Sequence, residues 1–159
     1  DANMKMDRSL RAGALALGAR VNIVTIPGYL PVINDGPLGG VFRQNAEILV
    51  GKDGFVAHSP TYSRGGSTDM GDLSHIMPAI HPYTGGASGM GHGEDYAIAD
   101  YEQAVIRPAK ALAMSVIDLL ANGAAKAREV LAKSPPRMTK EEYLRLQDSR
   151  LSEELYEGR

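Results

Sequence analysis

Histidine is the residue type in this sequence that is best suited to metal binding or to proton transfer near neutral pH. Four are present, and the last three lie between residues 75 and 92: His58, His75, His81 and His92. None of their spacings forms a compact ligand motif such as H-E-x-x-H. Taken singly, each is therefore more simply interpreted as a surface or hydrogen-bonding histidine than as a metal ligand.

His92 differs from the other three in its sequence context. It lies in Gly-Met-Gly-His-Gly-Glu-Asp-Tyr, residues 89–96, where the flanking glycines let the backbone approach a ligand closely. Glu94 and Asp95 follow, and carboxylates beside a ligating imidazole commonly fix its orientation. Because a catalytic zinc needs several protein ligands, one histidine does not make a metal site.

A glycine-rich segment is the second place where the residue types suit chemistry. It consists of Arg64, Gly65, Gly66, Ser67, Thr68 and Asp69. Such a loop exposes backbone N–H groups that can form a concave nest for a carboxylate or an oxyanion, and Arg64 can add a bidentate contact to a carboxylate. A plain turn with Asp69 as a cap explains the same residues equally well. The phosphate-loop pattern is absent.

Composition restricts the classes of function. The chain has 159 residues, which corresponds to about one domain, and its formal net charge of -2 argues against nucleic acid as the main partner. There is no cysteine, so disulfides and thiolate ligands are excluded. No apolar run approaches the roughly 18 residues that span a bilayer. We expect no membrane association and a cytoplasmic location.

The first part of the chain has clear local patterns. Residues 1–17 have helical spacing with Met6, Leu10, Ala14 and Leu17 on one face, and residues 21–26 are typical of a strand. Asp35 and Pro37 mark a helix start. The inward face of that helix is predicted to hold Leu38, Val41, Phe42, Asn45 and Leu49.

The rest of the chain begins with an irregular stretch, residues 59–94, in which we predict one short strand near 76–81. Helices are predicted at 108–120 and from about 124 to 133, with an interruption at Asn122-Gly123. Leu112, Val116 and Leu119 are predicted to line one face of the first of these, with Ala111 beside them. A capping box at Thr139–Glu142 predicts a charged helix that reaches about residue 156.

Three motifs together resemble a known family. They are Gly-Gly-Ser-Thr-Asp-Met-Gly-Asp-Leu-Ser-His-Ile-Met-Pro (65–78), Ile-His-Pro-Tyr (80–83) and Gly-His-Gly-Glu-Asp-Tyr (91–96). They are similar to the second catalytic half of the di-zinc amidohydrolases, which include aminoacylases, glutamate carboxypeptidases and aminobenzoyl-glutamate hydrolases. Residues 108–120 resemble the helix that closes the catalytic domain of this family, and residues 16–21 and 27–31 the end of its inserted lid domain.

The resemblance implies an α/β fold. Residues 1–31 would be the end of an inserted α+β lid or dimerisation domain. Residues 32–134 would be the C-terminal half of a zinc-aminopeptidase-like catalytic domain, a mixed sheet with flanking helices. Residues 135–159 would be a charged helical tail. By the same resemblance, the missing N-terminal half belongs to the same protein, and the lid mediates a homodimer.

The resemblance also implies site residues. His92 matches the last metal ligand of the family, in a site for two divalent metal ions, zinc or alternatively manganese or cobalt. The segment from Arg64 to Asp69 would hold the substrate carboxylate, and His75 and His81 would be wall or structural residues. The general-base glutamate belongs to the missing half, so this chain holds no catalytic residue, and Glu94 does not take that role.

The expected activity is metal-assisted hydrolysis of an amide whose amine side carries a free carboxylate, such as an N-acyl amino acid, an aminobenzoyl-glutamate-like compound or a dipeptide. Two alternatives remain open from the residues alone. One is a metal-free interaction or regulatory module derived from this fold. The other is a self-standing α/β binding protein, which would need a complete core within these 159 residues.

Overall fold

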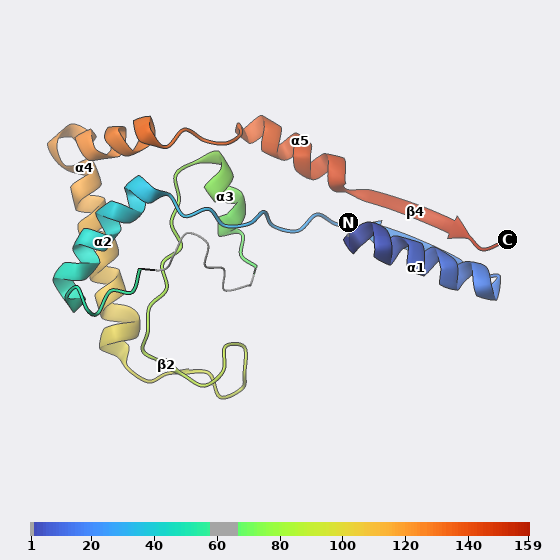
Figure 1. The fold of residues 1–159 in the computed structure, drawn as a ribbon, viewed down its shortest axis with the longest axis horizontal. Coiled ribbons are helices and arrows are strands. Elements are labelled where there is room, and N and C mark those ends of the chain that lie inside the picture. The colour runs from blue at the N-terminus through green and yellow to red at the C-terminus, as the bar shows by residue number, and fades with distance from the viewer. Residues whose placement is uncertain (1, 58–66) are drawn as a thin grey trace. The chain divides into compact units, whose positions relative to one another are not determined.

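A computed structural model describes residues 2–57 and 67–159. The chain divides into two units (Figure 1): residues 1–28 with residues 138–159 form the first, and residues 29–137 form the second. The described residues mix helices with short strands, as an α/β class requires, and their strands form two antiparallel pairs. Among the described helices, none combines the length and apolarity that crossing a bilayer demands.

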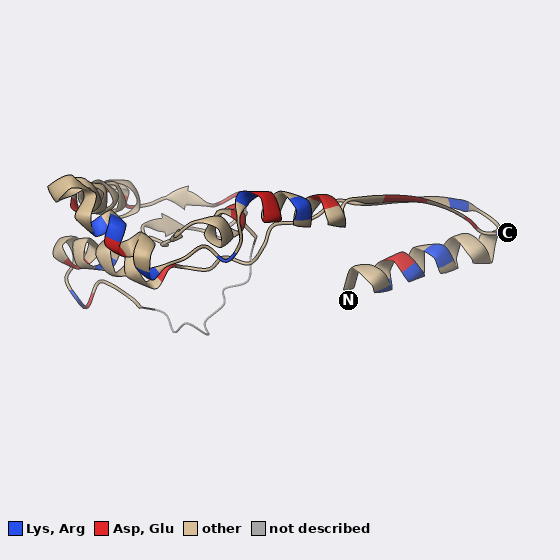
Figure 2. Cartoon of the chain, turned by 90° about the horizontal axis from the view of Figure 1, so that it is seen from above, with Lys and Arg blue, Asp and Glu red and all other residues tan. Residues whose placement is uncertain are grey.

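The first unit is built on a strand pair. Helix α1 (Ala2–Leu17) ends at Gly18, which has a φ of 59° and so adopts the left-handed conformation that suits a glycine C-cap. Strand β1 (Arg20–Thr25) then pairs antiparallel with β4 (Ser152–Glu157), and α1 contacts both strands. Acidic and basic residues are interspersed along α1 and α5 (Figure 2).

The capping box predicted at Thr139 is present. The hydroxyl oxygen of Thr139 accepts from the Glu142 amide, and the Glu142 carboxylate accepts from the Thr139 amide at 2.7 Å. Helix α5 (Lys140–Arg150) follows, but it ends before the expected limit near residue 156. The residues beyond it extend into β4, because the backbone groups of β1 offer a sheet edge that a helix would leave unpaired.

The second unit has its core between two helices. Helix α2 (Gly36–Val50) starts at Asp35, whose carboxylate accepts from the Leu38 amide at 2.7 Å. It packs against α4 (Arg107–Lys133), and the core cluster is Phe42, Ala46 and Ala111, with Leu49, Phe55 and Ile80 against it. The predicted inward face of α2 is confirmed at Val41, Phe42 and Asn45, which are buried.

Helix α4 confirms one prediction and corrects another. Its backbone leaves helical geometry at residues 121–124, where the interruption was predicted. The apolar face predicted for residues 108–120, however, is not the buried one: the exposed fractions of Leu112 and Val116 are 50% and 52%. The residues that pack inward are Ala111 and Ser115. Their small side chains let α4 approach α2 closely enough for the Ser115 hydroxyl oxygen to accept a hydrogen bond from the side-chain amide of the buried Asn45.

The segment between α2 and α4 contains the remaining elements. The strand predicted near residues 76–81 is not present; residues 70–76 form helix α3 (Met70–Ile76), and residues 77–81 are assigned to no strand. Strands β2 (Ala87–Ser88) and β3 (Ala97–Ile98) then form a hairpin, and a π-helical turn, η1 (Glu102–Ile106), leads directly into α4. Residues 77–81 have no partner strand among the described residues, and an unpaired extended segment is not stable as a strand. The strand predicted near 76–81 therefore does not form.

Candidate functional site

His92 lies on the loop that joins β2 to β3. Two backbone hydrogen bonds tighten this loop, from Gly93 to the Met90 carbonyl at 2.7 Å and from Tyr96 to the Gly93 carbonyl at 3.2 Å. The φ of His92 is 66°, a conformation that is uncommon for a residue with a Cβ and that concentrates at functional sites. The side chain is exposed, so both ring nitrogens are accessible.

The acidic residues beside His92 do not orient it. The Asp95 carboxylate accepts from the Met90 amide at 3.4 Å and so serves the loop backbone. Within the described part of the chain, no group of three or more His, Asp or Glu side chains is close enough to hold a metal ion. An exposed imidazole fits one coordination position.

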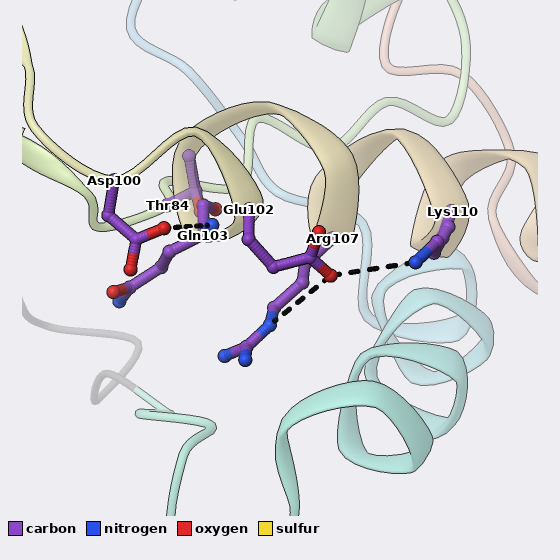
Figure 3. A network of polar contacts seen from close by, with 6 residues as sticks. All are labelled: Thr84, Asp100, Glu102, Gln103, Arg107 and Lys110. Carbon is purple, nitrogen blue, oxygen red and sulfur yellow. Dashed lines mark hydrogen bonds and ion pairs between the residues drawn. The ribbon is translucent and has the colours of Figure 1, made fainter.

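The base of the hairpin is attached to the start of η1 (Figure 3). The Thr84 hydroxyl donates to the Gln103 carbonyl at 2.8 Å, and the Asp100 carboxylate accepts from the Gln103 amide at 3.0 Å. The amides of Ala99 and Asp100 both donate to the Gly86 carbonyl. π-Helical turns occur frequently at functional sites, and here the turn supports the loop that carries His92.

At Gly86 the base of the hairpin makes a second close contact with the chain around the start of η1. Its φ is 93°, and a Cβ added there would lie 2.7 Å from the Asp100 carbonyl oxygen and 2.8 Å from the Ala104 amide nitrogen. A glycine is therefore required for the hairpin to pass this close to η1. The sequence contains the signal, a Gly-Gly pair after Thr84, but its meaning depends on a contact that the sequence does not reveal.

Only part of the glycine-rich segment can be placed. Arg64, Gly65 and Gly66 lie outside the described residues. Ser67 is exposed. Thr68 and Asp69 lie directly before α3, and their carbonyls accept from the amides of Gly71 at 3.1 Å and Asp72 at 3.0 Å, respectively.

One interpretation of this segment was a plain turn in which the Asp69 side chain caps a helix, and the structure does not show such a cap. The Asp69 carboxylate makes no capping bond to the helix. The Thr68 hydroxyl oxygen instead accepts from the Met70 amide at 3.3 Å. The Asp69 carboxylate accepts from the Thr68 hydroxyl at 3.3 Å and makes no bond to the helix backbone.

His75 and His81 have structural contacts. A ring nitrogen of His75 lies 3.1 Å from the Pro31 carbonyl oxygen, to which it can donate. The His81 ring lies edge-on to Tyr83, with the ring centroids 5.2 Å apart. These contacts agree with the structural roles expected for both. His58 lies outside the described residues.

Sequence reasoning missed the polar side chains of α3. Asp72 and Ser74 accept hydrogen bonds from the amides of Leu30 and Ile33. A cavity of about 240 Å³ lies beside Ile33, Ser74 and Arg137, away from every predicted site residue. Ser74, Met77 and Pro78 of the 65–78 motif line it, but none of the residues to which the resemblance assigned a metal-binding or substrate-binding role does, so we assign it no part in the chemistry.

Comparison with known proteins gives two curated relatives. The chain is 34% identical to the mouse Xaa-Arg dipeptidase over 122 residues, and 33% identical to the human Xaa-Arg dipeptidase over the same length. Each match covers 73% of this chain and 28% of the relative. No family model and no solved structure matches the chain significantly. Over most of its own length, the chain is therefore similar to little more than a quarter of two mammalian dipeptidases.

Proposed function

We propose that this chain forms part of a metal-dependent amidohydrolase or peptidase, with residues 1–31 as the end of a lid, 32–134 as half of a catalytic domain and 135–159 as a tail. Two independent observations support the proposal. The relatives are dipeptidases, and the one histidine that the motif singles out is held on a tight loop in a rare backbone conformation. The position of His92 carries the argument.

In this proposal His92 holds one of two divalent metal ions. Such ions polarise a scissile carbonyl and lower the pKa of a bound water. The loop from Gly89 to Tyr96 keeps the imidazole exposed and limits its backbone freedom, so little ordering is needed when it binds. Glu94 is exposed on the same loop, and the general base is a glutamate outside this chain.

The substrate class follows from the glycine-rich segment and from the relatives. A dipeptide carries a free carboxylate on the amine side of its scissile bond, as an N-acyl amino acid does. Small residues that expose N–H donors suit such an anion. We assign this role to the segment from Arg64 to Asp69, and dipeptides that end in arginine are the first substrates to assay.

The test is His92→Ala in a full-length polypeptide that contains this chain. We expect bound metal, measured by elemental analysis after gel filtration, to fall, and turnover to be nearly abolished. His81→Ala is the matched control, because that ring packs against the neighbouring Tyr83 and has no role in the proposed metal site. Metal content and rate at the unsubstituted level in His92→Ala would show that the ligand lies elsewhere.

A further inference from the structure

Helix α3 holds the extended segment that follows β1 along the chain (Figure 1). The Asp72 carboxylate accepts from the Leu30 amide at 2.8 Å, and the Ser74 hydroxyl oxygen accepts from the Ile33 amide at 3.0 Å. His75 contacts the Pro31 carbonyl between them. Because this segment belongs to no sheet, side chains of α3 satisfy backbone groups that otherwise would need solvent.

The approach of α3 to this segment depends on Gly71. A Cβ at this position would lie 1.7 Å from the Leu30 carbonyl oxygen. Gly71 and Ser74 are both buried, and the Ser74 hydroxyl also donates to the Gly71 carbonyl at 2.6 Å. The contact is thus a close backbone-to-backbone packing and not a pair of surface hydrogen bonds.

The same helix binds a second, distant segment. The amide of Arg137 donates to the His75 carbonyl at 2.9 Å. The second unit comprises residues 29–137, so Leu30 lies next to its first residue and Arg137 is its last. His75 therefore contacts both places at which the chain enters and leaves this unit, through its ring at one and its carbonyl at the other.

We propose that α3 couples these two connecting segments, with His75 as the positioning residue, so that they are held or released together. Neither segment is held by deep burial: Arg137 is exposed, and Leu30 and Ile33 are only partly buried. Their shared attachment to one helix turns separate weak contacts into a cooperative set. This inference concerns the second unit itself and does not rest on the proposed function.

The coupling is tested on the 159-residue chain by site-resolved amide hydrogen exchange measured by NMR. In Asp72→Ala, exchange at Leu30 should rise about 10- to 150-fold, the range for the loss of one hydrogen bond to a charged group. Coupling requires a rise of similar size at Ile33 and at Arg137, neither of which bonds to Asp72. Asp72→Asn keeps an acceptor oxygen and should restore slow exchange at all three amides.

His75→Ala is the second variant. It removes the ring contact to Pro31 but leaves every amide bond in place, so faster exchange at both Leu30 and Arg137 is expected only if the segments are coupled. His81→Ala is the control, and the buried helix amides of Val41 and Ala111 report whether the unit stays folded. Faster exchange confined to Leu30 in Asp72→Ala, with Arg137 unchanged in both variants, would overturn the proposal.

Discussion

Single side chains in this molecule carry roles that their residue types alone leave open. His92 and His75 are both partly or fully accessible histidines, yet one lies on a strained loop without a protein partner among the described residues and the other bonds to a backbone carbonyl. The difference comes from the backbone around each. The glycines on both sides of His92 mark its unusual backbone context in the sequence. Nothing local to His75 predicted its contact with Pro31.

Arg64 is expected to bind the substrate carboxylate and not to activate water, because a guanidinium that is always charged is a poor proton acceptor. In a full-length enzyme, Arg64→Ala should mainly raise KM. The lost charge-assisted hydrogen bond is worth roughly 1.5–3 kcal/mol, or about 10- to 150-fold. The effect should shrink for a substrate whose carboxylate is replaced by a neutral amide. Equal impairment on both substrates would make Arg64 a structural residue.

Glu129 provides a pH-dependent contribution to stability. Hydrogen bonds from Lys133 and Lys126 lower the pKa of its carboxyl from 4.5 to about 2. A carboxyl whose folded pKa is depressed stabilises the fold above its unfolded pKa, and this contribution is lost as pH falls through the folded value. The stabilising effect should therefore be complete above about pH 4.5 and disappear toward pH 2.

The measurement is the melting temperature of the unsubstituted chain and of Glu129→Gln from pH 7 to pH 2. The two should differ at neutral pH and converge below pH 4.5. High salt should reduce the difference at neutral pH, because the three side chains are about half exposed and screening weakens such pairs. Parallel curves over the whole pH range would contradict the lowered pKa.

Helices and strands divide into those that local signals predicted and those that they did not. The starts of α2 and α5 are encoded by cap residues that act within three positions, Asp35 on Leu38 and Thr139 on Glu142. The interruption in α4 is encoded by Asn122 and Gly123, both of which have positive φ. Signals of this range can be predicted from the sequence because every partner lies within one turn.

Two of the failures involve a partner that is distant in the chain. Residues 152–156 were predicted as helix, but they pair with residues 21–25. Leu112 was predicted to share one apolar face with Val116 and Leu119, but the buried residues opposite α2 are the small Ala111 and Ser115. The site followed the same rule: the loop of His92 could be predicted, and its attachment to η1 could not.

Gly71 should be the least replaceable glycine of the described helices. Gly71→Ala would place a Cβ 1.7 Å from the Leu30 carbonyl oxygen, so α3 must move away and lose its bonds to Leu30 and Ile33. We expect a loss of at least about 2 kcal/mol in unfolding free energy, from two hydrogen bonds at about 1 kcal/mol each, measured by urea denaturation.

The matched control is Gly40→Ala in α2. A Cβ at Gly40 has no heavy atom within 4 Å, and alanine in a helix interior is favoured over glycine by about 0.5–1 kcal/mol. This variant should be more stable than the unsubstituted chain. If both alanine variants shift stability in the same direction, the close packing at Gly71 does not control the position of α3.

At the scale of the whole chain, the described residues expose many large apolar side chains. Met6, Leu17, Ile117 and Leu120 are each more than 60% exposed, and none of the described large side chains is less than 2% exposed. A self-standing binding protein would need a more complete core. The chain also spans little more than a quarter of its curated relatives, and both observations favour the proposal that it acts as a part of a larger enzyme.

The isolated chain is accordingly expected to have no amidase activity. One ligand cannot build a two-metal site, and the described residues contain no cluster that could complete it. The assay adds zinc, manganese or cobalt to the purified chain and follows hydrolysis of dipeptides and N-acyl amino acids. Sustained turnover that co-elutes with the chain and disappears in His92→Ala would contradict this expectation and reveal a complete site.

The pairing of β1 with β4 sets an order of events during synthesis. Thr25 pairs with Ser152, a residue 127 positions later. At about 5–20 residues per second, the ribosome needs roughly 6–25 s to make the intervening chain. The second unit is therefore fully synthesised before the partner strand β4 exists. During that interval the edge of β1, which is rich in β-branched residues, is available to chaperones and to other nascent chains. Translation speed, and not only sequence, then influences how much of this protein reaches the paired state.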